Sequence, residues 1–181
     1  MKRLLILTVD LDLEEILKES LERRQRRNER ALHEDFDEEE MEALEEEQAA
    51  EDEVFDQFSE CVGTLLKSFK SNILADIEPL LQSKIAPMFV PERSAEERRI
   101  AICIFDDVFE HASQGGATLR YLPGFSDACV RGSSDADADV RQASVYGYVF
   151  EFFLLISFFF PYANDDNHGF PFLIHENGSS C

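Results

Sequence analysis

Apolar residues recur about one helical turn apart between Leu11 and Leu21, which predicts an amphipathic helix over residues 11–34. The apolar stripe stops at Leu21, and a polar run with close Glu and Arg pairs follows from Glu22 to Arg30. This run has two interpretations: a nuclear-localisation or RNA-binding patch, or a solvated helix face. Acidic residues flank it on both sides, which favours the solvated face.

Residues 34–53 are rich in Asp and Glu and contain no basic residue. Glu, Ala, Met and Leu have high helix propensity, but like charges one turn apart oppose the helix. We expect a loop that runs into the first turns of a helix, where acidic residues are favourable. Two roles stay open for this segment: docking of a basic partner, or a disordered spacer.

Residues 54–147 show repeated helical periodicity and are expected to form the folded part. The first stripe runs from Val54 to Phe69, Ser71 and Asn72 break it, and the next runs from Ile73 to Ile85 with a kink expected at Pro79. Strand signals are nearly absent, so the fold class is all-α.

Local signals place the later helix ends. Ser94 and Glu97 have capping-box spacing, which opens a helix that Gly115 and Gly116 end. Another helix is expected after this, interrupted around Pro123–Gly124, and a fresh one starts at about Ala138. Ile100, Ile104, Phe105 and Val108 form the predicted buried stripe of the helix after Ser94, with Asp106, Asp107 and Glu110 towards the other face.

The helices pair at roughly 40-residue spacing, which indicates a HEAT or armadillo α-solenoid of antiparallel helix pairs. A four-helix bundle is the competing architecture, and the spacing alone decides weakly between them.

Charge restricts the class of partner. The chain has 38 acidic and 17 basic residues among 181, a formal net charge of −21. Nucleic acids and anionic membrane surfaces are bound through Lys and Arg, so neither is the expected partner. A partner attracted over long range should be basic.

Two further features suggest the compartment. Cys61, Cys103, Cys129 and Cys181 are widely separated and form no CxxC pair, which favours buried free thiols in a reducing compartment over zinc ligation or a redox motif. The apolar run from Leu4 to Val9 is too short for a signal peptide, so the chain is expected in the cytosol or in both cytosol and nucleus.

Specific strings then point to a family. The segments Glu96–His111 (EERRIAICIFDDVFEH) and Asp137–Gly147 (DADVRQASVYG), with the acidic stretch and the helix after it, resemble the β-karyopherin import receptors. Within that family the resemblance is to the importin-5 (importin β-3) type. It covers about residues 10–147, so the chain is expected to be a fragment from the C-terminal region of such a receptor, holding two to three repeats.

The resemblance implies a HEAT-repeat receptor that carries basic cargo into the nucleus and releases it to Ran-GTP, with nucleoporins as further partners. Acidic side chains on the inner helices would bind the cargo through charge-assisted hydrogen bonds. Arg98 and Arg141 are expected to make structural contacts between repeats, and pairing of Asp107 or Glu110 with one of them is an equally open role. The candidate cargo-binding residues are Asp106, Asp107, Glu110, Asp137 and Asp139.

The resemblance stops at Gly147, and the chain divides into residues 1–53, 54–147 and 148–181. Residues 145–163 are almost entirely apolar, close to the length needed to span a membrane. Three interpretations of the tail stay open: translated non-coding sequence, which we favour, a membrane anchor, or a helix that a partner buries. The first would make the chain a truncated non-functional or regulatory product, and the second a tail-anchored adaptor.

No catalytic set is evident. The four histidines are scattered, and Asp106 and Asp107 are adjacent on a helix and so point about 100° apart. Phosphate-loop and nucleophile motifs are missing from the sequence. The sequence therefore predicts a binding protein with no enzymatic activity, no cofactor and no metal.

Overall fold

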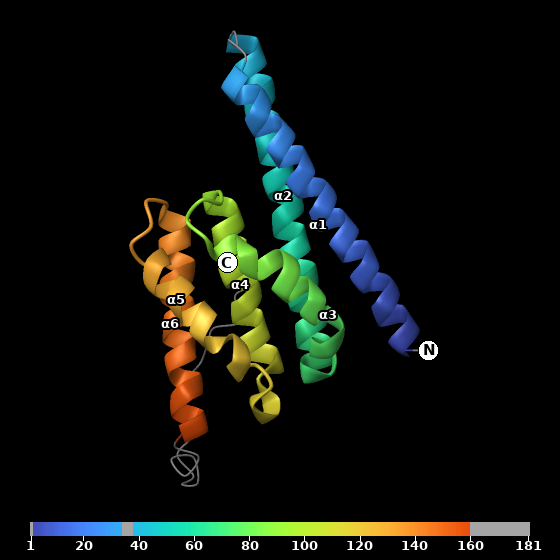
Figure 1. The fold of residues 1–181 in the computed structure, drawn as a ribbon, viewed down its shortest axis with the longest axis vertical. Coiled ribbons are helices and arrows are strands. Elements are labelled where there is room, and N and C mark those ends of the chain that lie inside the picture. Colours follow the sequence, from blue (N-terminus) through green and yellow to red (C-terminus); the bar gives the residue numbers. More distant parts are fainter. Residues whose placement is uncertain (1, 34–37, 160–181) are drawn as a thin grey trace. The chain divides into compact units, whose positions relative to one another are not determined.

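The computed structural model describes residues 2–33 and 38–159, and within these ranges the chain is all-α, which confirms the predicted fold class (Figure 1). The chain forms two compact units, residues 1–88 and residues 89–181. Helical segments shorter than five residues connect the longer elements. The longer elements are α1 (Lys2–His33), α2 (Glu38–Phe69), α3 (Leu74–Leu80), a π-helical turn (Leu81–Ile85), α4 (Ala95–Ala112), α5 (Leu122–Gly132) and α6 (Ala138–Phe159).

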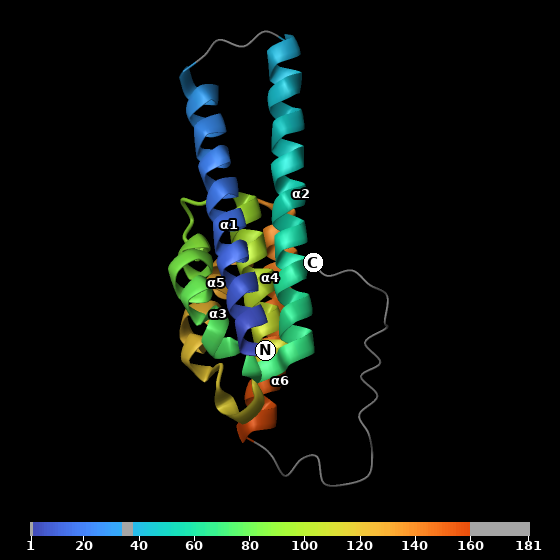
Figure 2. The same ribbon diagram turned by 90° about the vertical axis from the view of Figure 1, so that its right-hand side faces the viewer.

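The first unit is a hairpin of two long helices with a short third helix. Figure 2 shows α1 and α2 alongside each other, and α3 packs against α1. Apolar side chains are buried in the half of the hairpin that lies near α3, since Leu13 and Leu17 of α1 and the stripe of α2 are inaccessible. The buried residues of α2 are Phe55, Phe58, Val62 and Leu66, as its periodicity predicts.

The acidic segment is more ordered than the sequence suggests. We expected a loop before the first helical turns, but α2 is continuous from Glu38 to Phe69, so residues 38–53 are helical. Residues 34–37 lie outside the described residues. Glu38, Glu39 and Glu40 occupy the first turn, where the helix dipole favours negative charge.

After α2, the rest of the first unit consists of short helical segments. α2 ends at Phe69, Lys70 adopts a left-handed backbone with φ of 53°, and a 3₁₀ turn covers Lys70–Asn72. Regular α-helix then ends at Leu80, directly after Pro79, and the π-helical turn follows. Proline has no N–H to donate, so α3 lacks one backbone hydrogen bond in the turn before Pro79.

In the second unit α4 and α6 run parallel, with α5 packed against both. The direction follows from two contacts: Arg98 near the start of α4 meets Asp135 just before α6, and Asp106 lies beside Gly147 farther along. Aromatic rings fill the core between these elements, with ring centroids 4.9 to 6.4 Å apart. These rings belong to Phe89, Phe105, Phe109, Tyr121 and Phe125.

Local signals located the helix starts well. Ser94 and Glu97 form a capping box, in which the Glu97 amide donates to Ser94 Oγ and the Ser94 amide donates to the Glu97 carboxylate. α6 begins at Ala138, as predicted. The expected interruption at Pro123–Gly124 is wrong, because α5 begins at Leu122 and Pro123 occupies its first turn, where a missing N–H costs little.

Two expectations about burial need correction. Asp106 does not lie on an open face, since it is only 6% exposed and packs near Gly147. Cys61 is exposed, whereas Cys103 and Cys129 are buried as expected, and Cys181 lies outside the described residues.

The predicted boundary at Gly147 has no break in secondary structure, since α6 continues through it to Phe159. Among residues 2–33 and 38–159, no helix is both long and apolar enough to cross a membrane. Residues 160–181, which hold the rest of the tail, lie outside the described residues.

Candidate functional site

α4 and α6 begin in the same way, which marks them as equivalent helices of successive repeats. Ser94 caps the first amides of α4, and Asp137 caps those of α6, where its Oδ1 accepts from the amides of Asp139 and Val140 at 2.9 and 3.0 Å. Four residues after each cap stands an arginine, Arg98 in α4 and Arg141 in α6. The same position in each repeat is therefore cationic.

Each arginine also binds backbone carbonyls of the turn that precedes its own helix. Arg98 Nη1 donates to the carbonyl of Arg93, and Arg141 Nη1 donates to the carbonyls of Asp135 and Ala136 at 2.8 Å each. A guanidinium group has several donors in fixed directions, so it can hold a turn and still bind a carboxylate. Both arginines thus fasten the start of a repeat helix.

Arg98 additionally joins the two repeats. Its Nε and Nη2 donate to the two carboxylate oxygens of Asp135 at 2.9 and 2.8 Å, and both side chains are mostly buried. The hydrogen bonds from Arg98 are the main cause that lowers the pKa of Asp135, with further help from the Asp137 amide and the charge of Arg141, against the opposing effect of burial. Sequence reasoning named Arg98 and missed Asp135.

The candidate cargo-binding residues do not converge on one place. Asp107 is half-buried and Glu110 exposed in the last turns of α4, whereas Asp139 is exposed in the first turn of α6. Arg98 lies beside Asp135, just before the start of α6. Asp107 is nine residues farther along α4, which is about 14 Å of helix, so it lies well away from the start of α6, where Asp139 is found. Asp106 is buried, so two separate acidic positions remain on the surface.

His111 completes a small cluster at the end of α4. Its ring nitrogens lie 4.0 Å from carboxylate oxygens of Asp107 and of Glu110, and one ligand atom from each of the three residues lies within 4.8 Å of the others. Exposed acidic groups are common without a bound ion, so this cluster alone does not indicate a metal site. The cluster gives a local surface of mainly negative charge that can accept hydrogen bonds from a cationic side chain.

A second charged region lies in the first unit, where arginines of α1 face acids of α2. Arg24 is buried, pairs with Asp52, and its guanidinium carbon lies 4.1 Å from the centroid of the Phe55 ring. Arg23 Nε donates to Glu51 at 2.5 Å, and Arg30 pairs with Glu47. The interpretation of Glu22–Arg30 as a solvated face is therefore wrong for Arg24 and for Arg27, which is 8% exposed.

Glu51 is held ionised by this pairing. Burial by itself would raise the pKa of the Glu51 carboxyl, but hydrogen bonds from Ser20 and Arg23 and the charges of Arg23 and Arg24 outweigh it and lower the pKa. Ser20 Oγ donates to Glu51 at 2.7 Å. The sequence suggested that the acidic segment docks a basic partner. Some of its acids instead pair with arginines of α1 in the same chain.

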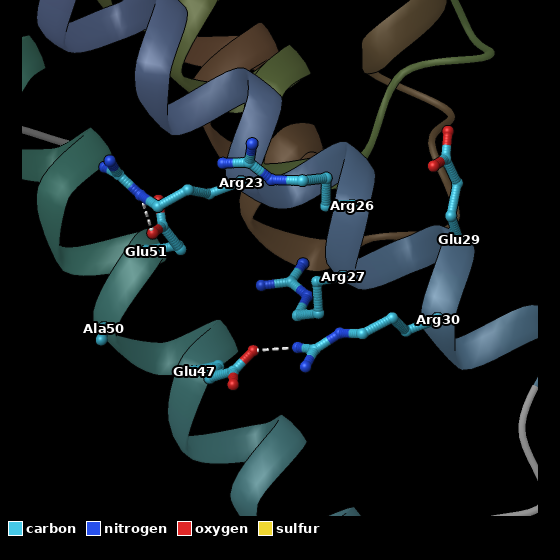
Figure 3. A pocket seen from close by; sticks show the side chains of 8 residues that line it. All are labelled: Arg23, Arg26, Arg27, Glu29, Arg30, Glu47, Ala50 and Glu51. Carbon is cyan, nitrogen blue, oxygen red and sulfur yellow. Dashed lines mark hydrogen bonds and ion pairs between the residues drawn. The ribbon is translucent and has the colours of Figure 1, made fainter.

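An open groove of about 800 Å³ lies between α1 and α2 in this region (Figure 3). Its arginines stand at helical spacing of three and four residues, so they share one face of α1. The spacing of the arginines can be seen in the sequence. The groove itself cannot, because the acids opposite them lie on another helix, α2. The lining residues are Arg23, Arg26, Arg27, Glu29, Arg30, Glu47, Ala50 and Glu51.

Comparison with known families matches the first unit of the chain. Residues 11–86 match the family described as Importin repeat 6, which takes in α1 from Leu11, α2, α3 and the π-helical turn. The match covers 76 of the 181 residues, less than half of the chain, and agrees with the resemblance seen in the sequence. The part of the chain that contains the charged hairpin is therefore the part that is similar to an importin repeat.

Proposed function

We propose that this chain is part of a nuclear import receptor and acts by binding basic segments of other proteins, without catalysis. The observation that carries the proposal is the importin-repeat match over residues 11–86. An all-α chain with two equivalent capped helices in its second unit is the architecture that such a receptor needs. The proposal places the protein in the cytoplasm and the nucleus.

The exposed acids at the end of α4 are the proposed contact for a basic cargo segment. Glu110 is exposed, Asp107 is half-buried beside it, and no Lys or Arg among the described residues is recorded within ion-pair distance of Glu110. A Lys or Arg of the partner would receive charge-assisted hydrogen bonds there. Asp139, at the start of α6, would contact a second basic residue of a longer segment.

Asp137 has a different role in this proposal. Its carboxylate is occupied as the N-cap of α6, so its loss should weaken the helix start more than partner binding. Arg98 links α4 to the turn before α6, and Arg141 fastens that turn to α6, so neither is a partner contact in this proposal. The proposal also implies that the whole receptor is of the importin-5 type. Ran-GTP and nucleoporins would be partners of that whole receptor.

Fluorescence anisotropy of a labelled basic peptide, titrated with the protein near physiological salt, tests the proposal. Saturable binding should weaken several-fold in the double variant Asp107→Asn, Glu110→Gln, since two favourable charges are lost. The control variant Glu60→Gln, Glu92→Gln removes the same charge from two other exposed positions and should bind normally. Equal weakening in both variants, or no binding by the folded protein, would contradict the proposed contact.

A further inference from the structure

The groove between α1 and α2 contains a buried cation with an unused donor. Arg27 is 8% exposed, and its Nη1 is buried without a hydrogen-bond acceptor among the described residues. Its Nη2 makes one long contact of 3.4 Å with Asn28. A guanidinium group keeps its charge at any physiological pH, so a buried donor without an acceptor is unfavourable unless a ligand supplies one.

Charge counting shows that the groove is not neutral. Glu51 pairs with Arg23 and Glu47 pairs with Arg30, so each of these acids balances one arginine. Arg26 is exposed, and among the residues whose side chains the structure describes no carboxylate forms an ion pair with it. Glu29 also lines the groove, so four arginines face three glutamates and one positive charge remains there, within a chain whose net charge is −21.

The direction of these donors selects the shape of the ligand. Figure 3 shows Arg27 between α1 and α2, with Arg30 on the next turn of α1 and Arg23 one turn before. Donors that arrive from successive helical turns suit the oxygens of a tetrahedral phosphate better than the single plane of a carboxylate. A phosphate monoester carries a charge of about −1.5 to −2 at pH 7, so the excess positive charge of the groove attracts it, and its oxygens can accept from the buried Nη1 of Arg27.

We propose that the groove between α1 and α2 binds a phosphate group, with Arg27 and Arg26 as its principal ligands and Arg23 and Arg30 beside them. The volume of about 800 Å³ and the open side leave room for the phosphate to be carried by a larger molecule. The group can come from free phosphate or from a phosphorylated side chain of a partner protein. This anion site is separate from the acidic surface of α4 and does not rest on the function proposed above.

Isothermal titration calorimetry on the full chain tests this site at constant ionic strength. Sodium phosphate should bind saturably with one site, and sodium acetate at the same concentrations should not. A short peptide with one phosphoserine, compared with its serine counterpart, identifies the source. Tighter binding of the phosphopeptide than of phosphate indicates a phosphorylated side chain, and equal binding indicates the phosphate group alone.

Two variants and one control locate the site. Arg27→Gln should weaken phosphate binding about tenfold or more, and Arg26→Gln should also weaken it, because each removes a charged hydrogen-bond donor. Lys18→Gln removes one positive charge from the same helix outside the groove and should leave binding unchanged. Circular dichroism checks that each variant is folded. If Arg27→Gln does not fold, phosphate binding by Arg26→Gln tests the site, because Arg26 is exposed and its loss should not disturb the fold.

The proposal is overturned if the folded protein binds neither phosphate nor the phosphopeptide saturably. It is also overturned if Lys18→Gln weakens binding as much as Arg26→Gln does, because attraction would then be general to α1. Equal binding of acetate and phosphate would exclude selection of a tetrahedral anion and count against the site.

Discussion

Arg98 and Asp135 form a two-point ion pair across the repeat boundary, with distances of 2.9 Å from Nε to Oδ2 and 2.8 Å from Nη2 to Oδ1. The side chains are 16% and 14% exposed, so little water competes for either partner. Paired and hydrogen-bonded in this way, the two groups fix the turn before α6 against α4. Loss of one partner would leave a mostly buried charge in place.

Asp135→Asn should therefore lower the free energy of unfolding by about 1 to 3 kcal/mol. In the variant Arg98 keeps its charge but faces a neutral amide, which is a weaker partner than the carboxylate. Asp127→Asn is the matched control, since Asp127 also pairs with an arginine but is 66% exposed. That control should change stability by less than about 0.5 kcal/mol. Urea unfolding followed by circular dichroism measures both, and equal losses would show that the repeat contact has no special weight.

The same ion pair predicts a pH dependence. The pKa of Asp135 in the folded chain lies below its ordinary value of 3.8, chiefly through the Arg98 hydrogen bonds. Its stabilising contribution is thus complete above the unfolded pKa and is lost as the pH falls through the folded pKa. The stability difference between the wild type and Asp135→Asn should be constant from pH 7 to 5 and shrink below about pH 4.

Unfolding free energies at pH 7, 5 and 3 check this dependence. The corresponding difference for Asp127→Asn should stay small at every pH. A difference for Asp135→Asn that persists unchanged at pH 3 would mean that the variant acts through packing and not through the carboxylate charge.

Features that depend on local sequence were predictable. The Ser94 capping box, the start of α6 at Ala138 and the buried stripe from Ile100 to Val108 each depend on residues within one or two helical turns. Helix periodicity and capping chemistry are enough to find such features. The all-α class followed from the same signals.

Features that depend on which helices meet were not predictable. Arg24 is buried because Asp52 and Phe55, about 30 residues away, lie against it, and the sequence alone shows only a polar run. Asp106 is buried because Gly147 of α6 passes beside it. Side-chain burial at both positions is decided by tertiary contacts that no local spacing encodes.

The Arg24–Asp52 pair predicts an asymmetry between its two partners. Arg24 is 6% exposed and Asp52 is 32% exposed. Asp52→Ala leaves a buried guanidinium without its carboxylate and should cost about 2 to 4 kcal/mol. Arg24→Met keeps an unbranched side chain against Phe55 and leaves an acid that water can reach, so it should cost less than about 1.5 kcal/mol.

Thermal and urea unfolding of both variants and of the double variant measure this asymmetry. The double variant should resemble Arg24→Met, because removal of the arginine removes the reason for the Asp52 penalty. A larger loss for Arg24→Met than for Asp52→Ala would show that packing of the arginine on Phe55 outweighs its charge.

Gly147 predicts a tight constraint on how α6 packs. A Cβ atom at this position would lie 2.8 Å from Phe125 Cζ, 3.1 Å from Cys129 Sγ and 3.3 Å from Asp106 Oδ1. Gly147→Ala should therefore force the helices apart or the ring aside and cost about 1 to 3 kcal/mol, although alanine favours a helix more than glycine does. Chemical denaturation measures the loss.

Gly124 supplies the control, because it also lies in a helix and its added Cβ would meet nothing within 4 Å. Gly124→Ala should be neutral or stabilise the chain by up to about 1 kcal/mol, through helix propensity and a less flexible unfolded state. The opposite signs separate packing from propensity, since both variants make the same chemical change. If Gly147→Ala were as stable as Gly124→Ala, α5 and α6 would have room between them, and close approach would not explain the glycine.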